Sequence, residues 1–210
     1  MHSINNSREQ GIVLKLDYKK AYDRVSWTFL FDMLQSRNFD PTIINWIKQL
    51  VVGGSVGIML NGEDSSYFKT GKGLRQGDPL SPFPFNLIGD DLSKMLAKAT
   101  NKGLVKGLLE DFKPGCIVAL QYADDTILFS KAEESALLNL KCVLMWYEQI
   151  SGMGINFHKS ELVPLNLEHN EAHRLAHIFS YPLGSFPINY LGVPLHYDKL
   201  NREDISAFSR

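Results

Sequence analysis

Residues 116–129 decide the fold, and they read CIVALQYADDTILF. Two apolar, β-prone runs flank Ala123, Asp124 and Asp125, so the pattern predicts a hairpin of two strands with carboxylates at its tip. A third carboxylate, Asp17, follows the short β-prone run of residues 12–16 and is also expected at a strand end. An isolated Asp-Asp pair is most often a favourable turn dipeptide, and Asp17 alone is compatible with an ordinary strand end. Only their context separates these interpretations.

Three clustered carboxylates would be a site for divalent metal ions. Two carboxylates about 4 Å apart repel by about 4 kcal/mol at an effective dielectric near 20, and a bound cation removes that cost. Hard ions such as Mg²⁺ prefer oxygen ligands, and two ions held by shared carboxylates assist phosphoryl transfer. We therefore predict a two-ion Mg²⁺ site, in which Mn²⁺ can substitute.

The rest of the pattern predicts helices and a second hairpin. Helices are expected after the caps Ser26 and Asp40, and a hairpin around Asn61-Gly62 with Tyr67–Lys69 in its second strand. Two longer helices are expected from Pro82 and over 133–150, with buried stripes formed by Phe85, Ile88, Leu92, Leu96 and Ala99 and by Leu137, Leu140, Leu144 and Tyr147. This mixture predicts an α+β fold. Beyond Pro164 the signal weakens.

Composition bounds the function. The 210 residues include 22 basic and 23 acidic side chains, a balance that argues mildly against a free-standing nucleic-acid binder. Cys116 and Cys142 have neither zinc-site nor disulfide spacing, so we expect reduced, buried thiols. We interpret Asp90-Asp91 as solvated charge near a helix start. Without a signal segment or an apolar run long enough to span a bilayer, we expect an intracellular, soluble protein.

Three sequence blocks occur in this order along the chain: LDYKKAYD at 16–23, RQGDPLSP at 75–82 and YADD at 122–125. A fourth block, YLGVPL, follows at 190–195. Together they closely resemble the reverse transcriptases of plant non-LTR (LINE-type) retrotransposons, over almost the whole chain. The resemblance implies a right-hand polymerase palm, an antiparallel sheet backed by helices, with partial fingers and the start of a thumb. It implies an RNA-directed DNA polymerase that adds dNTPs to a DNA primer 3′-hydroxyl on an RNA template.

The same resemblance assigns the metal ligands and the sugar contact. Asp17 and Asp124 would bind the catalytic metals, and Asp125 would complete the acidic cluster. Tyr22 falls at the position of the steric gate that rejects a ribose 2′-hydroxyl. Ordinary core packing is the rival explanation for Tyr22.

Four further residues are implied in substrate handling. Gln76 and Gly77 would contact the incoming nucleotide and the template, and Arg75 would help to hold phosphate; a helix-entry turn explains the nearby prolines but not Arg75 and Gln76. Residues 154–160, GINFHKS, resemble motif D, so Lys159 would be the acid that protonates the leaving pyrophosphate. Solvated surface charge explains Lys159 equally well.

The resemblance also sets the expected domains. Residues 1–165 would be the palm with a fingers-proximal segment, and 166–210 an incomplete connection from palm to thumb. The fingers, thumb and endonuclease regions of the parent polyprotein are not expected in this chain, so it should be weak or inactive alone. No membrane is expected as a partner. The alternatives are an inert remnant that folds without catalysis and a two-metal nuclease or phosphatase. The second alternative leaves Tyr22 and the residues Arg75, Gln76 and Gly77 without a role.

Overall fold

The structure, a computed structural model, describes residues 9–64, 66–108 and 119–196, and Cys116 lies outside these ranges. The chain divides into two compact units. Unit 1 comprises residues 1–17, 93–144 and 155–210, and unit 2 comprises residues 18–92 and 145–154. Positions on both sides of residue 165 therefore fall in unit 1.

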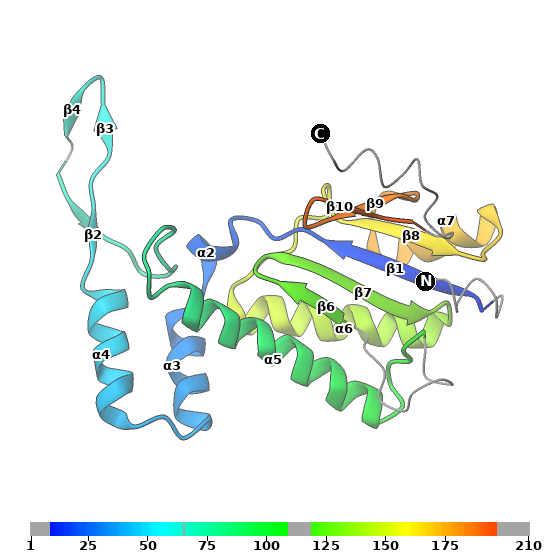
Figure 1. Ribbon diagram of the computed structural model, residues 1–210, viewed down its shortest axis with the longest axis horizontal. Coiled ribbons are helices and arrows are strands. Elements are labelled where there is room, and N and C mark those ends of the chain that lie inside the picture. The colour runs from blue at the N-terminus through cyan, green and yellow to red at the C-terminus, as the bar shows by residue number, and fades with distance from the viewer. Residues whose placement is uncertain (1–8, 65, 109–118, 197–210) are drawn as a thin grey trace. The chain divides into compact units, whose positions relative to one another are not determined.

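Unit 1 is built on a four-stranded antiparallel sheet (Figure 1). Its order is β6 (Ala119–Tyr122), β7 (Asp125–Lys131), β1 (Gly11–Leu16) and β8 (Glu161–Leu165). The predicted hairpin with Asp124-Asp125 at its tip is confirmed as β6 and β7. Because β1 is central and covered on both faces, its residues Ile12, Val13 and Leu14 are all buried, which explains the nearly continuous apolar run.

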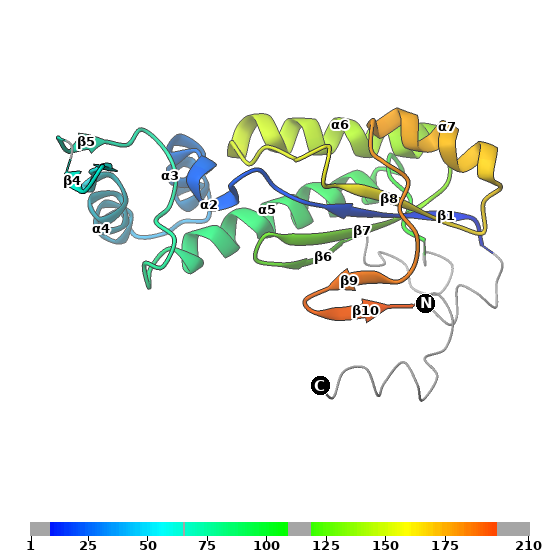
Figure 2. The same cartoon turned by 90° about the horizontal axis from the view of Figure 1, so that it is seen from above.

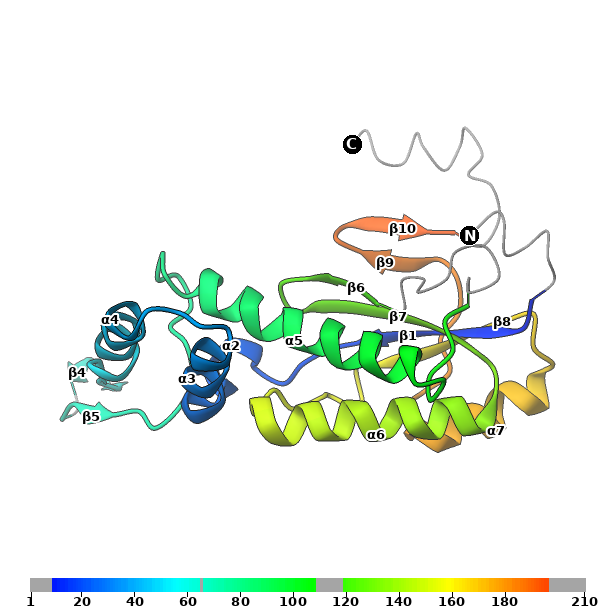
Figure 3. The ribbon, with the colours of Figure 1, turned by 90° about the horizontal axis from the view of Figure 1, so that it is seen from below.

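Helices cover one face of this sheet and a hairpin covers the other. The helical side carries α7 (His169–Phe179) and the unit 1 part of α6 (Glu134–Ser151), whereas the hairpin of β9 (Ile188–Tyr190) and β10 (Val193–Leu195) lies opposite (Figures 2 and 3). A buried cluster joins the hairpin to the sheet, formed by Val13, Leu108, Ile127, Val163, Leu165 and Ile188. These layers form an α+β fold, as predicted.

Both long helices match their predictions. Helix α5 (Pro82–Asn101) keeps its course through Pro84, because an N–H in the first helical turn has no intrahelical acceptor to lose. Helix α6 ends before Gly152, whose φ of 78° suits glycine. Every residue of the two predicted stripes is buried.

Unit 2 begins with three helices, α2 (Ala21–Arg24), α3 (Trp27–Ser36) and α4 (Pro41–Val52). The predicted caps are confirmed: the Ser26 hydroxyl accepts a hydrogen bond from the backbone of Phe29, and the Asp40 carboxylate accepts one from Thr42. Three apolar residues are spaced at helical intervals along α4, namely Ile43, Ile47 and Leu50. They do not form a buried face, since Ile47 is buried but Ile43 is 41% and Leu50 59% exposed.

Four short strands follow in unit 2: β2 (Ser55–Val56), β3 (Met59–Leu60), β4 (Glu63–Asp64) and β5 (Phe68–Lys69). The Asn61-Gly62 turn joins β3 to β4, and both of its residues have positive φ, as a two-residue hairpin turn requires. The prediction placed Tyr67–Lys69 in the second strand of that hairpin. This was wrong, because β5 pairs with β2 instead.

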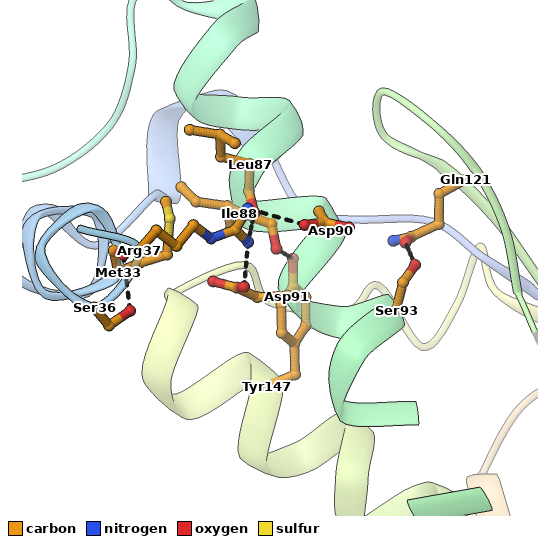
Figure 4. Close-up of polar contacts among 10 residues, drawn as sticks. All are labelled: Met33, Ser36, Arg37, Leu87, Ile88, Asp90, Asp91, Ser93, Gln121 and Tyr147. Atoms are coloured by element: carbon orange, nitrogen blue, oxygen red, sulfur yellow. Dashed lines mark hydrogen bonds and ion pairs between the residues drawn. The ribbon is translucent and has the colours of Figure 1, made fainter. Parts of the chain in front are cut away.

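The interpretation of Asp90-Asp91 as solvated charge holds for Asp90, whose side chain is 49% exposed, but was wrong for Asp91, whose side chain is 19% exposed. Figure 4 shows the Arg37 guanidinium between the two carboxylates: it forms an ion pair of 2.9 Å with Asp90, a second with Asp91, and a hydrogen bond of 2.9 Å to the carbonyl of Leu87. Arg37 and Asp91 are largely buried side chains, and the network ties the end of α3 to α5 within unit 2. Sequence patterns miss such pairs because the partners lie far apart along the chain.

The sequence also misjudged one cysteine and the segment beyond Pro164. The thiol of Cys142 is exposed and not buried. The three elements α7, β9 and β10 lie beyond Pro164, where no element was predicted, although α7 buries Ala172, Leu175, Ala176 and Phe179 at helical spacing. Within the described part of the chain, no helix combines the length and apolar character needed to cross a membrane.

Candidate functional site

Asp17 directly follows β1 and is half-buried. Its backbone N–H donates a 3.1 Å hydrogen bond to the hydroxyl of Ser160, and its carbonyl accepts a 2.8 Å hydrogen bond from the N–H of Asn156. Asp17 is therefore fixed by its main chain, which leaves the carboxylate available as a ligand.

Asp124 and Asp125 lie at the tight turn between β6 and β7. Ala123 adopts a φ of 51°, and Tyr122 pairs with Asp125 across the turn, so the reversal takes two residues. Both carboxylates are exposed. The neighbouring Gln121 accepts a 2.7 Å hydrogen bond from the hydroxyl of Ser93, which anchors β6 to α5 within unit 1 (Figure 4).

The sheet register brings the two acidic positions to one edge. Leu16 pairs with Thr126, and continuing this antiparallel register by one residue sets Asp17 opposite Asp125. No ion pair forms at Asp17, Asp124 or Asp125 with any residue that the structure describes. Oxygen donors without a cationic partner, gathered at one sheet edge, suit a hard divalent ion.

The side chains nevertheless do not stand in a ready coordination geometry. Among the described residues, no group of three or more His, Cys, Asp or Glu is close enough to hold a metal ion. The backbone therefore places Asp17, Asp124 and Asp125 at one edge of the sheet. Their side chains would have to rotate to form the predicted three-carboxylate cluster.

Tyr190 is a neighbour of this site that the sequence did not single out. Partial burial raises the pKa of its phenol above the ordinary value, and the negative charge of Asp125 raises this pKa further. Tyr190 thus lies within electrostatic reach of Asp125. The signal available in the sequence was the YLGVPL block, to which no residue role was attached.

Tyr22 lies on α2 in unit 2 and is half-buried. Its ring stacks on Phe85 of α5, with centroids 4.1 Å apart and planes 5° from parallel. Its backbone carbonyl accepts a hydrogen bond of 2.8 Å from Leu74. The packing explanation therefore accounts for one face of the ring, and the stack fixes the ring plane.

The loop before α5 carries the remaining predicted contacts of unit 2. Arg75, Gln76 and Gly77 are exposed, and the N–H of Asp78 donates to the carbonyl of Arg75 to close a turn. Gly77 has a φ of 87°, and no atom lies within 4 Å of the place a Cβ would take. The Arg75 guanidinium rests so close to Gly54 that a side chain at position 54 would displace it.

Lys159 is exposed in the loop before β8, in unit 1. Its N–H donates a 3.1 Å hydrogen bond to the carbonyl of Asn156, the residue that also binds the Asp17 backbone. The predicted site residues thus divide between the units: Asp17, Asp124, Asp125 and Lys159 belong to unit 1, and Tyr22, Arg75, Gln76 and Gly77 belong to unit 2.

Comparison with known proteins gives a consistent picture. Residues 1–195 match the family described as reverse transcriptase (RNA-dependent DNA polymerase). The chain is 25% identical over 176 residues to the Pol polyprotein of retrotransposable element R2DM from Drosophila melanogaster, covering 84% of this chain and 16% of that protein. It is 30% identical over 161 residues to the polyprotein of an R2 element from Popillia japonica, covering 75% and 22%. The chain therefore spans less than a quarter of the length of these relatives.

Among solved structures, a Candida albicans telomerase in complex with a telomeric RNA fragment superimposes with a TM-score of 0.61 at 14% identity. The match covers 92% of this chain and 30% of that one, and at this identity it shows a shared palm fold. The family match, the retrotransposon relatives and the fold agree, and the chain belongs to the reverse transcriptase (RNA-dependent DNA polymerase) family.

Proposed function

We propose that this chain is the palm of an RNA-directed DNA polymerase from a non-LTR (LINE-type) retrotransposon. The reaction is attack of a primer 3′-oxygen on the α-phosphate of a dNTP, directed by an RNA template. The observation that carries the proposal is the β1–β7 register, in which Leu16 pairs with Thr126 and so brings Asp17 beside the turn of Asp124 and Asp125. The amino-acid sequences of the RQGDPLSP and YLGVPL blocks favour a plant retrotransposon as the source.

Asp17 and Asp124 would hold two Mg²⁺ ions, or Mn²⁺, and Asp125 would complete the acidic set. Bound there, the ions supply Lewis-acid activation of the attacking oxygen and charge neutralisation at the leaving group. Lys159, on the loop that also holds the Asp17 backbone, would donate a proton to the pyrophosphate.

The residues of unit 2 would handle the nucleotide and template. Tyr22, with its ring plane fixed by Phe85, would exclude a 2′-hydroxyl. Gly77 offers open backbone, Gln76 an amide that can donate and accept at once, and Arg75 a charge for phosphate.

For the domains, we propose that residues 1–165 are the palm with its fingers-proximal segment and that 166–210 begin the connection to a thumb. The partners are an RNA template, a DNA primer and dNTPs. Firm template binding would need the fingers and thumb of a longer polyprotein, since phosphate contacts from Lys and Arg dominate nucleic-acid affinity.

Primer extension on poly(rA)/oligo(dT) tests the proposal, for this chain and for one extended by upstream fingers sequence. We expect synthesis that requires Mg²⁺ or Mn²⁺, stronger in the longer protein, and abolished by Asp124→Asn. Asp32→Asn, the same change at an exposed carboxylate of α3, is the matched control and should retain activity. Synthesis that survives Asp124→Asn would refute the metal assignment, and inactivity of both proteins would support an inert remnant.

A metal titration tests the site without catalysis. Mg²⁺ should raise the midpoint of thermal unfolding of the wild type and leave that of Asp124→Asn unchanged, because a ligand stabilises the state that binds it. Mg²⁺ is preferable to softer ions, since His169 and His173 on α7 place two imidazole nitrogens 3.0 Å apart.

A further inference from the structure

At Asp17, just after the end of β1, the backbone N–H and C=O no longer have strand partners. The ladder of β1 with β8 ends at the pair Lys15 and Glu161, and its ladder with β7 ends at Leu16 and Thr126. Asp17 is therefore the first residue without a strand partner on either side. A half-buried N–H and C=O at such a position need other partners, because an unpaired backbone group away from water is costly.

Two residues of one loop supply these partners. The hydroxyl of Ser160 accepts the hydrogen bond of the Asp17 N–H at 3.1 Å, and the N–H of Asn156 donates to the Asp17 carbonyl at 2.8 Å. Ser160 immediately precedes β8, so the pairing of Glu161 with Lys15 fixes it beside the end of β1. Its side chain thus takes the place of a carbonyl in the ladder.

The loop that carries these partners is itself held firmly. The carbonyl of Asn156 accepts hydrogen bonds from the N–H groups of Lys159 at 3.1 Å and Ser160 at 2.8 Å. Ser160 is fully buried, and Ile155 is nearly so. The hydroxyl that binds Asp17 therefore has little freedom to move.

We propose that Ser160 is a positioning residue for Asp17: its hydroxyl fixes the backbone from which the metal-binding carboxylate projects. This inference rests on the proposed function, because it assumes that Asp17 binds metal. Metal ligands must be held close to their productive geometry, and groups that orient them affect metal affinity without touching the ion. Since Lys159 is the adjacent residue, the same turn sets the positions of the proposed acid and of Asp17.

The test uses the full chain and two measurements. Ser160→Ala should speed amide hydrogen exchange at Asp17, followed by NMR, because that N–H loses its acceptor. It should also raise the Mg²⁺ concentration for half-maximal thermal stabilisation by about 10-fold, the usual scale for an orienting group. Ser160→Thr restores the hydroxyl and should return both readouts toward the wild type. Ser160→Cys keeps the volume with a weak acceptor and replaces Ser160→Ala if that variant folds poorly.

Ser130→Ala is the matched control. Ser130 is as buried as Ser160 and lies near the opposite end of β7 from Asp125. Its hydroxyl donates a hydrogen bond to the carbonyl of Lys106. Ser130→Ala should lower the midpoint of thermal unfolding without changing the stabilisation by Mg²⁺. If Ser160→Ala responds to Mg²⁺ as the wild type does, the positioning role is overturned. The metal site still stands in that case, provided that Asp124→Asn does not respond to Mg²⁺. No Mg²⁺ response in the wild type would overturn both.

Discussion

At the residue scale, β7 passes from exposure at the acidic turn to burial in the core within one residue. Asp125 is exposed at the sheet edge, whereas the next residue, Thr126, is buried, and its Oγ1 has no hydrogen-bond partner in the part of the chain that the structure describes. An unpaired buried hydroxyl opposes folding, because it has lost its water.

Thr126→Val should therefore stabilise the protein. Valine has nearly the same shape and removes the unpaired hydroxyl, so we expect the free energy of unfolding to rise by about 1 kcal/mol. Urea denaturation measures the change. Ser130→Ala, which removes a bonded hydroxyl from the same strand, should lower the free energy of unfolding. Destabilisation by Thr126→Val would show that the hydroxyl has a partner in solution.

At the scale of elements, the turns of unit 2 differ in how strongly they require glycine. Gly62 and Gly73 have nearly equal φ, 88° and 92°. A Cβ on Gly62 would meet nothing within 4 Å, whereas one on Gly73 would lie 2.6 Å from the carbonyl oxygen of Asp23. The indole N–H of Trp27 also donates to the Gly73 carbonyl at 2.7 Å, so the loop before α5 is held against the start of α3.

This pair of glycines predicts two different costs. Gly62→Ala should lower the free energy of unfolding by about 1 kcal/mol, the strain of a left-handed alanine. Gly73→Ala should cost about 3 kcal/mol, because the backbone must also move. Equilibrium urea unfolding of the two variants compares them directly. Equal losses would mean that the Gly73 loop adjusts freely.

The junction of α3 and α5 gives a second prediction at this scale. Arg37→Ala should destabilise by about 3 kcal/mol, because it removes one member of the largely buried Arg37–Asp91 ion pair. Arg174→Ala is the control, since its ion pair with Glu134 is more than half exposed and should contribute less than about 1 kcal/mol. Thermal and urea unfolding report both changes. A small loss for Arg37→Ala would indicate that water reaches Asp91.

At the scale of the whole molecule, net charge limits what the chain does alone. A net charge of −1 provides no general attraction for a phosphate backbone. We expect RNA binding weaker than about 1 µM at physiological salt, with a shallow dependence on salt concentration. Fluorescence anisotropy with a labelled RNA at two salt concentrations measures both. Tight, steeply salt-dependent binding would mean that the basic residues form a concentrated patch.

The sequence by itself determined much of this protein. Apolar periodicity predicted α5 and α6, cap residues predicted where α3 and α4 begin, and two apolar runs around Asp124-Asp125 predicted the β6–β7 hairpin. These features are local, because a helix stripe or a two-residue turn depends on residues a few positions apart. The ordered motifs indicated the family for the same reason, since each motif is a short stretch with fixed internal spacing.

The tertiary structure decided what depends on distant partners. The pairing of β5 with β2, the Arg37–Asp91 ion pair and the electrostatic link of Tyr190 to Asp125 join residues that no sequence window contains. The hydrogen bond from Asp17 to Ser160 spans 143 positions, and nothing in the local pattern of either residue predicts it. The sequence was enough to identify the three carboxylates. Which groups hold Asp17 in place was decided by the register of β1 between β7 and β8, because strand pairing is set by contacts across the sheet.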